Sequence, residues 1–142
     1  MPMIDVYAPT GTFPDRSAVA QQAAAVVMRW EAVPELDLFR DNTAGFVHDL
    51  DPGSASTVSG SASVVRVQVL TPVGVLDRAK QVGVVADLTS LVREHASAPV
   101  EHVWVLIVES PDGGWGIDGQ ACTGADIAAA ARAEIAARAA KA

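Results

Sequence analysis

Residues 64 to 74 read Val-Val-Arg-Val-Gln-Val-Leu-Thr-Pro-Val-Gly, a run rich in β-branched residues that stops at a Pro-Val-Gly turn. Branched side chains favour the extended backbone, while proline and glycine interrupt it, so the run predicts a strand that ends in a turn. Apolar residues at helical spacing follow over about residues 76–95, and Pro99 comes shortly after them. A second strand-like run spans residues 103–108. These segments predict one βαβ unit.

The same order of patterns occurs earlier in the chain. Residues 3–8 form an apolar, alternating run that stops at a Pro-Thr-Gly turn, and a helical pattern follows over about residues 15–31. Pro34 ends that pattern, and a weaker apolar segment between residues 36 and 47 is predicted to hold the second strand. We therefore interpret the sequence as one supersecondary unit used twice.

A segment rich in serine, glycine and proline, about residues 51–62, separates the two units and is predicted to be a linker. We expect a single domain over residues 1–142, with repeat 1 at about 2–50, repeat 2 at about 63–120 and a C-terminal helix at about 123–140. The predicted fold class is α+β. Two tandem βαβ units with right-handed crossovers share one four-stranded mixed sheet, with two helices on one face, a hairpin and the C-terminal helix.

Composition limits the partners of this chain. The net charge of −7 opposes binding to nucleic acid or an anionic membrane, and no apolar run reaches the roughly 18 residues of a membrane span. Cys122 is the single cysteine, which excludes an intrachain disulfide, and the N-terminus has no signal-peptide pattern. The three histidines show no metal-ligand spacing. We expect a cytoplasmic protein without metal or cofactor. Its sheet leaves one apolar face to be covered by oligomerisation.

Two further features place the chain beside a known family. It begins Met1-Pro2 directly before a strand, and the second unit ends in Glu-Ser-Pro-Asp-Gly-Gly-Trp-Gly-Ile-Asp-Gly, residues 109–119. This resembles the 4-oxalocrotonate tautomerase family of the tautomerase superfamily, whose βαβ unit starts with proline and ends in a hairpin similar to Glu-x-Pro-x-x-x-Trp/Phe-Gly-Ile-Gly-Gly. The doubled length is similar to fused two-repeat members such as malonate semialdehyde decarboxylase and cis-3-chloroacrylic acid dehalogenase. The resemblance implies a homotrimer.

The resemblance also implies an activity. Removal of Met1 would turn Pro2 into a secondary amine, and an apolar pocket lowers the pKa of such an amine toward neutrality. The implied function is a cofactor-free tautomerase that moves a proton on a small 2-oxo acid or enol with Pro2 as acid/base. Trp115 and Phe39 are expected to form the apolar wall of the pocket. With Met1 attached, Pro2 is a tertiary amide and cannot act as a base.

The arginines that hold the substrate carboxylate in the family are missing from the matching turns, which read Gly-Thr-Phe at residues 11–13 and Gly-Val-Leu at residues 74–76. Arg40 is the leading candidate for this role, with a solvated surface arginine as the alternative reading. Asp37 resembles an aspartate that orients or activates water in the decarboxylase relatives, but the motif is short and a chance aspartate in this loop is the preferred reading. Tyr7 is a candidate hydrogen-bond donor to substrate, or a core residue.

Three alternatives stay open. The site chemistry of the resemblance also fits a dehalogenase, hydratase or decarboxylase acting on a three-carbon acid. A non-catalytic trimeric relative that has lost the substrate-binding arginines fits the altered turns. An unrelated ferredoxin-like α+β domain of the small monooxygenase type also repeats βαβ units and oligomerises, but it requires neither the proline at the start nor the Trp-Gly-Ile hairpin.

Overall fold

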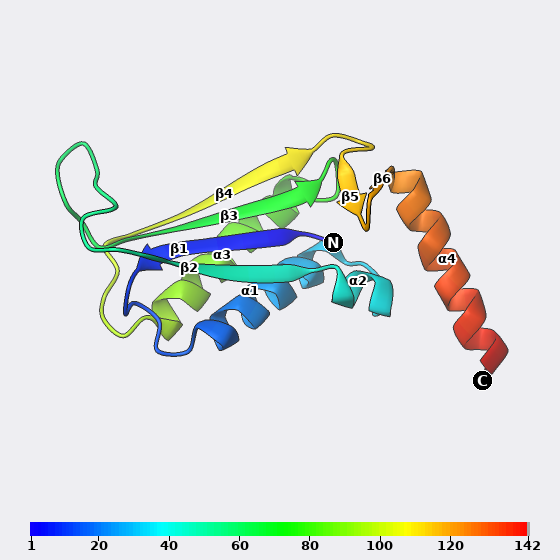
Figure 1. Ribbon diagram of the computed structural model, residues 1–142, viewed down its shortest axis with the longest axis horizontal. Helices are drawn as coiled ribbons and strands as arrows, with labels where there is room; N and C mark the ends of the chain where they lie inside the picture. The colour runs from blue at the N-terminus through cyan, green and yellow to red at the C-terminus, as the bar shows by residue number, and fades with distance from the viewer. Residues whose placement is uncertain (142) are drawn as a thin grey trace.

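The computed structural model describes residues 1–141 and confirms the α+β fold with a four-stranded mixed sheet (Figure 1). In chain order its elements are β1 (Met3–Pro9), α1 (Arg16–Glu31), α2 (Asp37–Asp41), β2 (Ala44–Leu50), β3 (Val64–Pro72), α3 (Arg78–His95), β4 (His102–Ser110), β5 (Trp115–Ile117), β6 (Gln120–Cys122) and α4 (Gly124–Lys141). The strand order of the large sheet is β2-β1-β3-β4. Each repeat contributes one parallel pair, and the central β1 and β3 run antiparallel.

The register relates the two repeats to one another. Val6 lies opposite Val67 in the antiparallel centre, and these two residues pair outward with Val47 and Val105 of their own repeats. Alternate side chains of β1 and β3 point to the helix side and are fully buried there. Helices α1 and α3 cover that single face of the sheet (Figure 1), and their apolar sides complete the main core. No helix in residues 1–141 is long and apolar enough to cross a membrane.

The helix ends follow the local chemistry of their residues. Asp15 caps α1 by accepting a hydrogen bond from the backbone N–H of Ala18 at 2.9 Å, and Asp77 caps α3 in the same way at 2.9 Å from the N–H of Lys80. At the start of α4 the hydroxyl of Thr123 donates to Asp126, which holds the pKa of that carboxyl below its usual value. These caps fix where each helix begins.

The segment after Pro34 differs from the sequence prediction. It was expected to continue as a strand, but Leu36 caps a short helix, α2, and β2 begins only at Ala44. Leu36 and Phe39 are three residues apart, so one helical turn brings both onto the same buried face. The side chains of Asn42 and Thr43 then bond back to the carbonyls of Leu38 and Phe39, which ends the helix.

The hairpin β5–β6 and helix α4 extend beyond one end of the sheet (Figure 1). The turn between the two short strands is Asp118-Gly119, and both residues have positive φ values of 47° and 84°. This two-residue turn is the form that matches the twist of a hairpin. The N-terminus of the chain lies at this same end of the sheet, where β3 and β4 finish (Figure 1).

Candidate active site

The first two residues of the chain are enclosed by protein. Met1 is 3% exposed and Pro2 is less than 2% exposed. The backbone N–H of Ala44 donates to the Pro2 carbonyl at 3.2 Å, which holds the start of β1 against β2. Most chain termini are solvated and mobile. The enclosure of this terminus therefore marks it as a candidate site.

A cavity of about 230 Å³ opens beside Met1. Its walls come from the end of α1, from α2, from the turn after β3, from the loop before β5 and from the first turns of α4. Phe39 and Trp115 supply its two aromatic rings, and both pack in one apolar cluster with Met1 and Leu36. The structure thus brings two of the residues that the sequence singled out, Phe39 and Trp115, beside Met1.

Glu31 is the charged side chain that contacts the Met1 amine. Sequence reasoning did not identify it as a site residue. Its side chain has no exposed surface, and its Oε2 lies 2.7 Å from the amino nitrogen of Met1. Its Oε1 accepts a hydrogen bond from the hydroxyl of Thr71 at 2.8 Å. Glu31 is the last residue of α1, where the helix dipole disfavours a negative charge. Only close partners make such a buried carboxylate tolerable.

Lys80 is a cation close to Glu31, but it binds backbone carbonyl groups and not the Glu31 carboxylate. Its Nζ donates to the main-chain carbonyl oxygens of Glu31 at 3.4 Å and Val75 at 3.3 Å. This places its charge at the C-terminal end of α1, where a cation is favourable. In the described part of the chain, no lysine or arginine lines the cavity.

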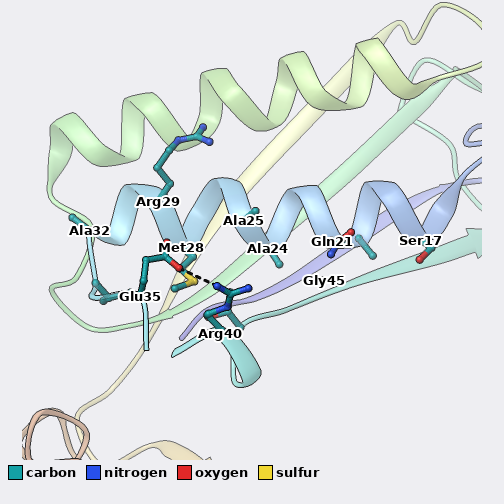
Figure 2. A pocket seen from close by; sticks show the side chains of 13 residues that line it. Ser17, Gln21, Ala24, Ala25, Met28, Arg29, Ala32, Glu35, Arg40 and Gly45 are labelled. Atoms are coloured by element: carbon teal, nitrogen blue, oxygen red, sulfur yellow. Dashed lines mark ion pairs between the residues drawn. The ribbon is translucent and has the colours of Figure 1, made fainter. Parts of the chain in front are cut away.

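Arg40 lies outside the cavity. It projects from α2 into an open groove along α1, where Figure 2 shows it directed toward Glu35. The two side chains form an ion pair at 3.5 Å, and the Arg40 side chain is 63% exposed. The groove has a larger volume than the cavity beside Met1, about 900 Å³ against about 230 Å³. Alanines and solvent-facing polar groups form most of its wall. The sequence prediction that Phe39 and Arg40 lie on a strand is wrong, because both lie on α2.

Asp37 holds α4 in place. Its side chain is 75% exposed and pairs with Arg138 at 3.0 Å. Its backbone N–H and that of Leu38 donate to the two carboxylate oxygens of Glu134 at 2.9 and 3.1 Å. The carboxylate of Glu134 therefore satisfies the free N–H groups at the start of α2. Asp37 does not line the cavity.

Tyr7 lies on the opposite, uncovered face of the sheet. Its ring stacks on His48 with 4.4 Å between centroids, and the guanidinium carbon of Arg66 lies 4.5 Å from its centroid. His48 Nε2 is 2.6 Å from Asp5 Oδ1. These residues form a polar row across three strands and do not reach the cavity. No group of three potential metal-ligating side chains gathers within residues 1–141.

The fold is thus two βαβ repeats that share one mixed sheet, with Pro2 enclosed at the start of the first strand. No family model matches the sequence, and no curated protein sequence matches it. Solved structures confirm the resemblance to the tautomerase superfamily at the level of the fold.

Three of these structures are the following. N1, a member of the cis-3-chloroacrylic acid dehalogenase family, aligns with a TM-score of 0.74 and 21% identity over 91% of this chain and 90% of its own. An asymmetric trimer of the fused 4-OT F6 aligns with a TM-score of 0.69 and 18% identity over 84% of this chain and 94% of its own. Pt0534, inactivated by 2-oxo-3-pentynoate, aligns with a TM-score of 0.70 and 14% identity over 87% of this chain and 97% of its own.

Proposed function

We propose that this chain, after removal of Met1, is a cofactor-free tautomerase-like enzyme that moves a proton on a small 2-oxo acid or enol, with Pro2 as the acid/base group. The observation that carries the proposal is the burial of Pro2 directly behind Met1, which itself lines a mostly apolar cavity walled by Trp115 and Phe39. A small carbonyl compound fits a cavity of about 230 Å³.

Loss of Met1 changes the chemistry of the Pro2 nitrogen. With Met1 attached this nitrogen is a tertiary amide and carries no proton. Cleavage makes it a secondary amine and frees the volume that Met1 fills against the cavity. The apolar wall then disfavours the charged amine and lowers the pKa of the Pro2 nitrogen, whereas a neighbouring carboxylate raises that pKa.

Roles for Arg40, Asp37 and Tyr7 at the substrate stay predictions, because all three side chains lie outside the cavity of the protomer. Arg40 is the residue proposed to hold the carboxylate of a 2-oxo acid. Since its side chain is 63% exposed at the surface, this role requires a boundary between protomers.

A homotrimer is part of the proposal. The outer face of the sheet carries exposed apolar side chains, and no element within residues 1–141 covers it: Phe46, Trp104, Leu106 and Val108 are 41–47% exposed. The fused 4-OT structures F6, Q0 and W0, which have a similar fold, are trimers. Burying three copies of this face against one another would remove this apolar surface from water.

A second candidate has an observation of its own. The ion pair of 2.7 Å between the Met1 amine and Glu31 gives an unprocessed chain a stable buried terminus. That favours a non-catalytic trimeric relative in which Met1 is kept. The dehalogenase, hydratase or decarboxylase alternative is supported by N1, which is a member of a dehalogenase family.

Three measurements on the purified full chain test the proposal. Intact mass spectrometry is expected to show loss of Met1, and 2-oxo-3-pentynoate is expected to attach covalently at Pro2. Ketonisation of phenylpyruvate is expected to fall about 10²- to 10⁴-fold in a Pro2→Ala variant, the range for loss of a general acid/base group. Retention of Met1, or equal rates from the two proteins, would support the non-catalytic reading instead.

A further inference from the structure

We propose that Glu31 is the second proton carrier of this site and faces Pro2 across the space that Met1 fills. The inference rests on the proposed function, since it requires the Pro2 nitrogen to be a free amine. It assigns a role in proton transfer to the last residue of α1, whereas Pro2 precedes β1 and Trp115 lies on the hairpin. The observations behind it are the complete burial of the Glu31 side chain and the direction of its Oε2 toward the chain terminus.

Once Met1 is removed, pairing with the Met1 amine no longer explains this carboxylate. Glu31 continues the buried stripe of α1 formed by Val19, Ala23 and Val27 at four-residue intervals, all of which are fully buried. An apolar side chain at this position would extend the stripe without placing a charge at the negative end of a helix. Its hydrogen-bond partners are the Met1 amine and the Thr71 hydroxyl, so loss of Met1 leaves Oε2 without its cation.

Covalent geometry places the two groups within reach of one substrate. The amino nitrogen of Met1 is 2.7 Å from Glu31 Oε2. Successive backbone nitrogens are about 2.8–3.6 Å apart, so the Pro2 ring nitrogen lies within about 6 Å of the carboxylate. The space between them is the one that the Met1 amine and Cα occupy. Thr71 holds Oε1, which leaves Oε2 facing that space.

This arrangement sets the protonation states of the pair. A carboxylate and an amine at such a distance favour the charged form of each other. The resting site of the processed chain is therefore a Pro2 ammonium facing a Glu31 carboxylate. Glu31 is the base, and Pro2 is the acid.

The proton transfer balances within the pair. The Glu31 carboxylate takes the proton of the enol hydroxyl, and the C–O bond becomes the carbonyl. The electron pair of the C=C bond takes a proton from the Pro2 ammonium at the neighbouring carbon. Glu31 is then a neutral acid and Pro2 a neutral amine. Return of the proton from Glu31 to Pro2, directly or through one water, restores both groups.

The charges of the wall select the substrate within the proposed class. Glu31 and Asp112 are the acidic residues that line the cavity, and in the described protomer no basic side chain lines it. Asp112 already accepts a hydrogen bond from the backbone N–H of Gly124 at 2.7 Å. The Pro2 ammonium offsets the charge of Glu31, so Asp112 leaves the cavity with a net negative charge that repels an anionic 2-oxo acid. The residues of one protomer therefore favour an uncharged enol or enolisable ketone.

The test uses the Met1-free full chain and its Glu31→Gln variant, which keeps the size of the side chain and its acceptor for Thr71. Phenylpyruvate and its methyl ester serve as anionic and uncharged substrates, and nitrogen NMR follows titration of the Pro2 amine. We expect Glu31→Gln to lower kcat about 10²- to 10⁴-fold. We also expect it to lower the pKa of the Pro2 amine and to reduce the preference for the ester over the acid.

Glu94→Gln is the matched control, because Glu94 lies near the end of α3 and is exposed. It is expected to match the parent protein in all three readouts. Glu31→Asp keeps the charge but moves it back by one methylene group, so its kcat and the pKa of its Pro2 amine should fall between those of the parent and Glu31→Gln. It provides the test if the glutamine variant does not fold.

The two proposals fail differently. Unchanged kcat and Pro2 titration in Glu31→Gln, with Pro2→Ala inactive, would overturn the role of Glu31 and leave the proposed function intact. Full activity in Pro2→Ala would overturn both proposals.

Discussion

At Gly45 only a hydrogen atom fits between β2 and α1. A Cβ built on this residue would lie 2.1 Å from the carbonyl oxygen of Ala20, which belongs to the backbone of the helix. A backbone atom in a helix cannot move aside as a flexible side chain can. The close approach of β2 to α1 thus depends on the absence of a side chain at one position.

Gly45→Ala is expected to destabilise the protein by about 1–3 kcal/mol, the usual cost of forcing extra volume into a packed site. Thermal unfolding followed by circular dichroism measures the effect. Gly116→Ala is the matched control, since Gly116 also lies in a strand and a Cβ there would meet no heavy atom within 4 Å. The control is expected to stay within about 0.5 kcal/mol of the parent. Equal stability of the two variants would contradict this account of Gly45.

Single residues also show where sequence reasoning about the site succeeds and where it stops. Trp115 was placed through a nearly continuous motif, and Phe39 through an apolar segment, and both line the cavity. Glu31 was missed because a glutamate at a helix end is usually solvated. The four-residue spacing from Val27, which is buried, was the available signal. Arg40 was expected in the strand after Pro34, but it lies on the helical turn of α2.

At the scale of elements, the two repeats were predictable to different degrees. Strands β3 and β4 are long β-branched runs, and their pattern allows one interpretation. The segment 36–47 is short and its apolar residues fit either period, so propensity did not separate α2 from β2. Tertiary contacts decide between them: Leu36 and Phe39 are buried in one cluster with Met1 and Trp115, and Glu134 of α4 caps the start of α2.

The contact between α4 and α2 has a defined dependence on pH. Desolvation acts to raise the pKa of the Glu134 carboxyl, but the backbone N–H groups of Leu38 and Asp37, together with Arg138, outweigh it and hold the pKa below its ordinary value. A carboxyl whose pKa is lowered by folding stabilises the folded state above its unfolded pKa and loses that contribution as the pH falls through the folded pKa. The contact is therefore expected to weaken as the pH falls below 4.5.

Hydrogen exchange at the Leu38 amide, measured from neutral pH downward, checks this expectation. Protection should fall in the acid range in the parent protein. Glu134→Gln should show reduced protection at neutral pH and little further loss in acid, because the group that titrates has been removed. An identical acid-induced loss in the variant would assign the effect to another carboxyl.

At the scale of the whole molecule, the sheet separates two environments. One face is sealed by α1 and α3, and the other carries three rows of side chains that cross all four strands. The row nearest the chain terminus is apolar: Ala44, Met3, Leu70 and Val108. The farthest row contains His48, Tyr7, Arg66 and Trp104. The apolar surface of this face lies next to the end of the sheet that holds the candidate site, so assembly and catalysis are expected to be coupled through it.

Leu106→Glu tests whether this face is the interface between protomers. Leu106 lies in the middle of β4, points outward and is 47% exposed. A carboxylate placed there without a partner would have to be buried in a trimer, at a cost of several kcal/mol for each copy. Sedimentation analysis is expected to show a trimer for the parent and a monomer for this variant. Val82→Glu, at a position of 53% exposure on α3, should remain a trimer. A trimeric Leu106→Glu variant would place the interface elsewhere, and a monomer that kept full activity would show that each protomer completes its own cavity.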